Sequence, residues 1–91
     1  MLVYNYRPAG NGQFALAVTT NTQLTVPPGA IGAYITVEGA SVRRTSNGES
    51  ASTTVGTLFV SGAQWADFGP LDTYKFTAVS GSPTLDVEYF K

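Results

Sequence analysis

Short alternating segments, separated by glycine, proline and asparagine, run through almost the whole chain and leave no room for a long helix. β-branched and aromatic residues alternate with polar residues in these segments, which is the pattern of a strand with one buried face. No segment combines apolar residues at i, i+3 and i+4 with strong helix formers. The pattern therefore predicts an all-β fold, either a small antiparallel β-sandwich or a jelly-roll-like barrel.

The expected strands lie between these turn signals. Phe14, Leu16 and Val18 are expected to share one face of the first strand. Asn47-Gly48 favours a type I′ turn, and the polar segment 49–54 is either a weak edge strand or a loop. The segment 62–72 has no assigned conformation. The expected strands span residues 13–20, 23–26, 33–38, 41–45, 57–61, 73–79 and 84–90.

The last two of these segments read as a hairpin. Gly81-Ser82 suits a two-residue type II′ turn, and that register places Phe76 opposite Val87. It also gives one apolar face and one polar face, with Lys75 opposite Glu88. We therefore expect the strands 73–79 and 84–90 to pair with each other.

The chain has 91 residues and is expected to form a single β domain over residues 1–91. Its first part, residues 1–12, needs separate treatment because a Pro- and Gly-containing stretch separates its apolar residues from the first expected strand. Two interpretations stay open for residues 1–12. They form an additional edge strand, or they form an arm that lies on a neighbouring subunit.

Composition excludes several partners. Charged residues make up 12% of the chain and the net charge is -1, so the Lys/Arg patch that nucleic-acid binding usually needs is missing. No apolar run approaches the ~20 residues of a membrane span, and the N-terminus lacks the features of a signal peptide. We expect no nucleic-acid or membrane partner, and synthesis in a cytoplasm.

Reactive residues are scarce. The chain has no histidine and no cysteine, which removes the usual general base, thiol nucleophile and soft metal ligands. Asp86 and Glu88 share one strand face, but we interpret them as solvated and balanced by Lys75. Asp67 and Asp72 flank Gly69-Pro70 and look like turn formers. We expect no enzyme activity, no metal and no cofactor.

Aromatic and arginine side chains are the remaining candidates for binding. Trp65, Tyr74 and Tyr89 could form a stacking platform for a sugar, although in so small a domain we favour core or interface positions for them. Arg43 and Arg44 point to opposite faces of their strand and are interpreted as structural or interfacial. The candidate interface residues are Leu2, Val3, Tyr4, Tyr6, Arg7, Arg43, Arg44 and Trp65.

Three sequence stretches carry a resemblance. They are the run from Ala33 to Arg43 that leads to Asn47-Gly48, the Gly56-Thr57-Leu58 that follows a Thr/Ser stretch, and the run from Phe76 to Phe90. Over residues 33–91 the chain resembles a group of short virion structural proteins of tailed bacteriophages, most of all the capsid decoration (cement) proteins. Residues 1–32 carry no such resemblance.

The resemblance implies a virion protein, made in the host bacterial cytoplasm, that binds the assembled head and bridges capsid subunits. Its partners would be the major capsid protein or other virion proteins, and it would be a homo-oligomer, with a trimer as the expectation by analogy. Two alternatives stay open. One is a tail, collar or head-fibre component, and the other is a carbohydrate-binding module of a receptor-binding apparatus.

Overall fold

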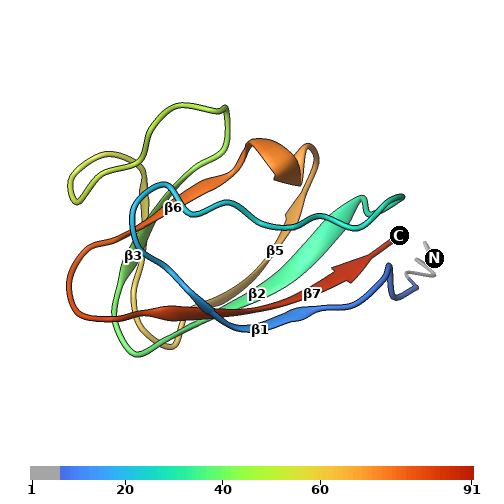
Figure 1. The fold of residues 1–91 in the computed structure, drawn as a ribbon, viewed down its shortest axis with the longest axis horizontal. Coiled ribbons are helices and arrows are strands. Elements are labelled where there is room, and N and C mark those ends of the chain that lie inside the picture. The colour runs from blue at the N-terminus through green and yellow to red at the C-terminus, as the bar shows by residue number, and fades with distance from the viewer. Residues whose placement is uncertain (1–6) are drawn as a thin grey trace, which may run out of the picture.

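Two antiparallel sheets face each other in the computed structural model, which describes residues 7–91 (Figure 1). The four-stranded sheet has the order β1 (Gln13–Ala17), β7 (Thr84–Phe90), β2 (Gly32–Glu38) and β5 (Gln64–Phe68). The three-stranded sheet has the order β4 (Thr57–Phe59), β3 (Val42–Thr45) and β6 (Lys75–Ala78). This is a small β-sandwich, as the sequence predicts.

The core lies between the two sheets and is built from alternate residues of their strands. Ile35 of β2 and Val87 of β7 are 0% exposed on one side, and Val42 of β3 and Phe76 of β6 are 0% exposed on the other. Their neighbours along each strand point outward, because successive side chains alternate across a sheet. The strand pattern in the sequence therefore marks which residues face the core.

The predicted C-terminal hairpin is wrong, because β6 and β7 belong to different sheets. β6 pairs with β3, and β7 pairs with β1 and β2. Gly81 has the positive φ of 64° that suits a turn, but the five residues 79–83 cross from one sheet to the other. Phe76 and Val87 both face the core. Lys75 therefore lies opposite Thr45 rather than Glu88.

The first strand is shorter than predicted and contains a bulge. Gln13 pairs with Val87 and Leu16 pairs with Leu85, so one extra residue of β1 interrupts the alternation. Ala15 has a φ of 55°, and its N–H donates to Asp86 Oδ1 at 2.8 Å. Phe14 is consequently 63% exposed while Val18 is 3% exposed, which corrects the prediction that they share a face.

Segments outside the named strands cover two sheet edges. Arg7 and Lys91 exchange backbone hydrogen bonds, and the N–H of Ala9 donates to Tyr89 O, so residues 7–9 lie along the end of β7. This part of the N-terminal segment is thus an edge extension of the four-stranded sheet. The predicted strand 23–26 is not formed, and Thr22 instead makes an isolated bridge to Phe76 of β6.

A long loop, residues 46–56, covers the outer face of the three-stranded sheet. Thr77 Oγ1 donates to Ala51 O, and Ala51 N–H donates to the side chain of Asn21. Gly48 has a positive φ, but Asn47 does not, so the predicted type I′ turn is not formed. The segment 49–54 is a loop rather than an edge strand.

The segment without an assigned conformation forms β5 and a short 3₁₀ helix, η1 (Leu71–Thr73). Leu71 anchors the 3₁₀ helix in the core at 1% exposure. Between residues 7 and 91, the structure contains no helix of the length and apolar character that crossing a membrane requires.

Candidate functional site: a groove on the four-stranded sheet

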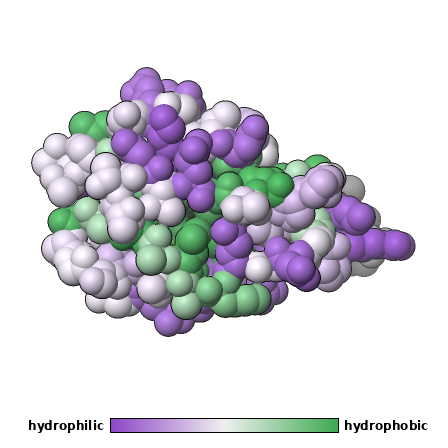
Figure 2. All heavy atoms as spheres, viewed as in Figure 1, coloured by the Kyte–Doolittle hydropathy of each residue, from purple (hydrophilic) through white to green (hydrophobic). Residues whose placement is uncertain are grey.

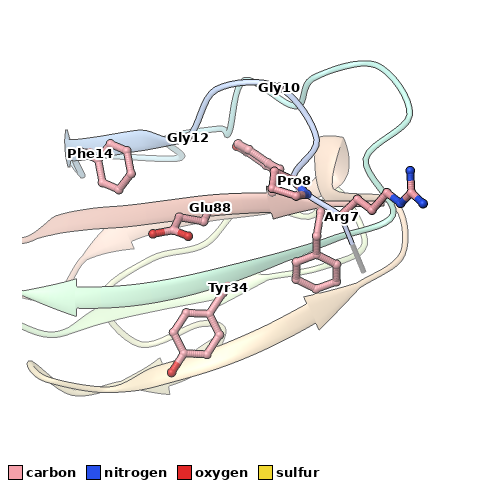
Figure 3. A pocket seen from close by; sticks show the side chains of 9 residues that line it. Arg7, Pro8, Gly10, Gly12, Phe14, Tyr34 and Glu88 are labelled. Atoms are coloured by element: carbon pink, nitrogen blue, oxygen red, sulfur yellow. The ribbon is translucent and has the colours of Figure 1, made fainter. Parts of the chain in front are cut away.

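A groove of about 380 Å³ opens on the outer face of the four-stranded sheet, near its N-terminal extension (Figure 3). It is formed where residues 7–14, β2 and β7 meet, three segments that are far apart in the sequence. It is lined by Arg7, Pro8, Gly10, Gly12, Phe14, Tyr34, Glu88, Tyr89 and Phe90.

Glu88 lies between two exposed aromatic rings in this groove. Tyr34 is directly opposite Glu88 on the neighbouring strand, and Phe14 lies on the other side of Glu88 (Figure 3). Cross-strand neighbours of this kind have Cβ atoms ~5 Å apart. Phe14 is 63% exposed and Tyr34 is 46% exposed, so both rings remain available to a ligand. Tyr34 is held in place because its hydroxyl donates to Gln64 Oε1 at 3.0 Å.

Gly12 keeps the wall of the groove open. A Cβ at this position would lie 2.6 Å from the backbone oxygen of Val87 and 3.1 Å from the ring of Phe14. A contact of 2.6 Å with backbone forces the chain to move, so the close approach of residues 10–14 to β7 requires glycine here.

The charges of the groove are separated along β7. Arg7 pairs with Lys91 at one end, and its guanidinium extends away from Glu88 in Figure 3. Glu88 and Asp86 lie further along the same strand, on the outer face. Within residues 7–91, no cation lies within ion-pair distance of Glu88. Arg7 and Lys91 lie in register with the buried pair Ala9 and Tyr89, two residues away on each segment, so their side chains leave the sheet on the opposite face from Glu88. The outer face of β7 thus carries Glu88 and Asp86 without a basic side chain from this pair.

Arg44 and Asp67 form an ion pair at the opposite edge of the sandwich. Arg44 Nη1 and Asp67 Oδ2 are 2.5 Å apart, and both side chains are 15% exposed. The Trp65 indole N–H donates to the same carboxylate oxygen. Asp67 therefore lies within strand β5 and binds Arg44, which corrects its prediction as a turn former. Asp72 lies in the first turn of η1.

Aromatic rings surround this ion pair. Trp65 stacks on Phe59 with ring centroids 3.7 Å apart, and the Arg44 guanidinium lies 5.2 Å from the Phe59 centroid and 5.1 Å from that of Tyr74. Tyr74 and Tyr89 are 5% and 3% exposed. Two of these rings are therefore buried and the third is stacked, so Trp65, Tyr74 and Tyr89 do not form the sugar platform that was the less favoured interpretation of the sequence.

The other predicted site residues have different surroundings. Arg43 donates to the backbone oxygens of Thr53 and Gly56, and so fastens the loop 46–56. Arg7 is exposed at the groove. Leu2, Val3, Tyr4 and Tyr6 lie outside the described residues. Across residues 7–91, no group of three or more His, Cys, Asp or Glu side chains is placed to hold a metal ion.

Sequence reasoning missed the groove itself. It paired Glu88 with Lys75, which the structure places in a different sheet, and it placed Phe14 on the same face as Leu16 and Val18, which the bulge in β1 prevents. The one signal that pointed to the groove was the glycine-containing stretch between Pro8 and Gly12, which lets the chain approach β7 closely.

A second apolar surface lies at the free edge of the three-stranded sheet. Val55, Leu58 and Val60 are 48%, 46% and 56% exposed, and β4 has a strand neighbour on one side only. The sequence from residue 50 to residue 66 contains no charged residue. In Figure 2, the visible face of the molecule has apolar and weakly polar residues lying between several patches of hydrophilic residues.

Burial beneath the groove raises the pKa of Tyr89 to about 12. Its hydroxyl donates to Gln13 Oε1, and desolvation of the phenolate is the cause of the raised pKa. The pKa of Tyr74 is also raised, first by burial and then by the charge of Asp67, while Arg44 opposes the rise.

The raised pKa of Tyr89 predicts alkaline destabilisation. The unfolded tyrosine loses its proton near pH 10, before the folded one, so this contribution is complete below pH 10 and is lost between pH 10 and 12. We expect a loss of about 2 kcal/mol in the free energy of unfolding, measured by urea unfolding from pH 8 to 12. Tyr89→Phe should flatten this part of the profile. An unchanged slope in that variant would contradict the assignment.

Comparison with known proteins brings no relative to light: the chain matches no family model, no curated protein and no solved structure.

Proposed function

We propose that this chain is a non-catalytic structural protein of a tailed-bacteriophage particle, a decoration protein that binds the assembled head and bridges capsid subunits. The observation that carries the proposal is the uncharged apolar edge formed by Val55, Leu58 and Val60 next to β4. The resemblance of residues 33–91 to small virion proteins supplies the class of partner, the major capsid protein.

An exposed strand edge is a template for pairing with another chain. Soluble proteins usually protect such edges with charged side chains, proline or a covering segment. Residues 7–9 and 19–22 cover edges of this molecule in that way, whereas the stretch around β4 contains no charge. An edge of this kind suits strand addition or flat packing against a partner protein.

Binding through a small surface is sufficient in a particle. A ligand that binds only the assembled lattice stabilises it by mass action. Oligomers that bind several equivalent sites gain further through effective concentration. The small β-sandwich with an apolar edge fits this mode of action, in which the protein acts through its contact with a partner and not through catalysis.

The test is binding to heads assembled without this protein. Recombinant protein should co-sediment with such heads and raise their disruption temperature in a thermal assay. Leu58→Asp introduces a charge at the β4 edge and should weaken binding by tenfold or more, since about 1.4 kcal/mol corresponds to tenfold. Ile31→Asp is the matched control, because Ile31 is also apolar and 50% exposed but lies outside this edge.

Two results would contradict the proposal. One is the absence of binding to heads under any salt condition while the protein is folded. The other is equal binding by the Leu58→Asp and Ile31→Asp variants at wild-type affinity. Binding to tails or collars instead of heads, located by electron cryo-microscopy, would assign the chain to another virion role.

A further inference from the structure

We propose that the groove on the four-stranded sheet binds an arginine side chain of a partner protein, with Glu88 as the counter-charge and the rings of Phe14 and Tyr34 on either side of the guanidinium. The inference goes beyond the proposed function, because it gives the molecule a second binding surface. The groove does not include the β4 edge, so the two surfaces can be tested separately.

Exposed aromatic rings mark the outer face of the four-stranded sheet as a binding surface. Phe14 and Tyr34 are 63% and 46% exposed at the groove, and Phe68 of β5 is 52% exposed. Single exposed apolar residues are ordinary on a protein surface, but a group of them on one face is typical of an interaction site. Aromatic residues are also enriched where proteins contact each other.

Glu88 supplies an unpaired charge between two of these rings. Its side chain is exposed and has neither an ion-pair nor a hydrogen-bond partner among residues 7–91. Phe14 lies on one side of it and Tyr34 on the other (Figure 3). A carboxylate in this position suits a guanidinium, because this group stacks on rings and forms paired hydrogen bonds with a carboxylate.

The outer face of the sheet is acidic around the groove. Asp86 and Glu88 of β7 and Glu38 of β2 point outward, because the alternate residues of both strands are buried in the core. Asp86 lies two residues from Glu88, which places the two carboxylates about 7 Å apart along the strand. An extended partner segment presents every second side chain at the same spacing, so basic residues at alternate positions match this face.

The five basic residues of this chain do not neutralise that face. Arg43, Arg44 and Lys75 belong to the three-stranded sheet. Arg7 and Lys91 lie in register with a buried pair of residues, so their side chains leave the end of β7 on the opposite face. Charge complementarity therefore favours a partner that brings its own positive charge to the groove.

The two rings are held in place before any ligand binds. The hydroxyl of Tyr34 donates to Gln64 Oε1 at 3.0 Å. The N–H of Ala15 donates to Asp86 Oδ1 at 2.8 Å, which fixes the bulge that turns Phe14 outward. A site whose side chains are already ordered loses less conformational entropy on binding, which favours affinity from a small contact.

The test is an NMR titration of the full chain with a capped peptide of sequence GRGRG, which carries arginine at alternate positions. Resonances of the groove residues should shift, and Glu88→Gln should weaken binding about tenfold. The lysine peptide GKGKG should bind more weakly, and the peptide with uncharged citrulline in place of arginine should bind about tenfold more weakly. Phe14→Leu and Tyr34→Ala should reduce the preference for arginine over lysine, since they remove the stacking rings.

The matched control is Glu49→Gln in the loop 46–56, which removes the same charge outside the groove and should leave binding unchanged. Leu58→Asp should also bind the peptide as the wild type does, which separates this site from the β4 edge. Circular dichroism checks that each variant is folded. The inference is overturned by a peptide that shifts no groove resonance at about 10 mM, by equal binding of the arginine peptide and either other peptide, or by wild-type affinity in Glu88→Gln.

Discussion

Replacing Phe76 with alanine should remove a large part of the free energy of unfolding of this protein. Phe76 is 0% exposed and is the largest of the fully buried side chains in the described part of the chain. Truncation of such a residue costs about 3–5 kcal/mol, from lost burial and from the cavity that remains. Native proteins have a total stability of about 5–15 kcal/mol, so this loss is a large part of the total. Urea unfolding followed by the fluorescence of Trp65 measures the loss.

Phe14→Ala is the control for this prediction, because it removes the same ring from an exposed position. Phe14 is 63% exposed, and its removal should change the free energy of unfolding by no more than about 0.5 kcal/mol. Equal effects of the two substitutions would show that Phe76 does not occupy the core between the sheets.

Replacing Asp67 with asparagine should destabilise the protein by about 3 kcal/mol. The change leaves the Arg44 guanidinium largely buried without its counter-charge. Arg44 Nε is already buried without a hydrogen-bond partner in residues 7–91, so the carboxylate is the acceptor on which the guanidinium depends. Removal of one partner of a buried pair costs more than the pair itself contributes, because an uncompensated charge remains.

A double-mutant cycle separates this effect from general disruption. Arg44→Met removes the charge and keeps a long apolar side chain next to Phe59 and Tyr74. Arg44→Met combined with Asp67→Asn should be less destabilised than the sum of the two single variants, by about 1–3 kcal/mol. Additive effects in urea unfolding would show that the two side chains do not interact.

The candidate groove illustrates what a sequence leaves open. Its members Arg7 and Glu88 are ordinary charged residues in the sequence, and Arg7 was a candidate for an interface only through its place in the N-terminal segment. The bulge at Ala15 decides that Phe14 points outward to join Glu88, and pairing of residues 7–9 with the end of β7 forms one wall of the groove. Both depend on contacts between segments more than 70 residues apart.

The sequence by itself determined the all-β class and, to within a few residues, where β2, β3 and β7 lie. Local alternation carries this information, because a strand with one buried face needs apolar residues at every second position. It also placed Phe76 and Val87 on the apolar faces of their strands, and both side chains are buried in the core.

Only the tertiary structure decided how the strands that carry Phe76 and Val87 are arranged. The same alternation fits two strands side by side in one sheet and two strands facing each other across a sandwich core. In both arrangements the apolar residues meet, and the five residues between β6 and β7 allow either. Long-range strand pairing decides between the two arrangements, because β6 pairs with β3 and β7 pairs with β1 and β2. The local pattern of alternation does not encode these pairings.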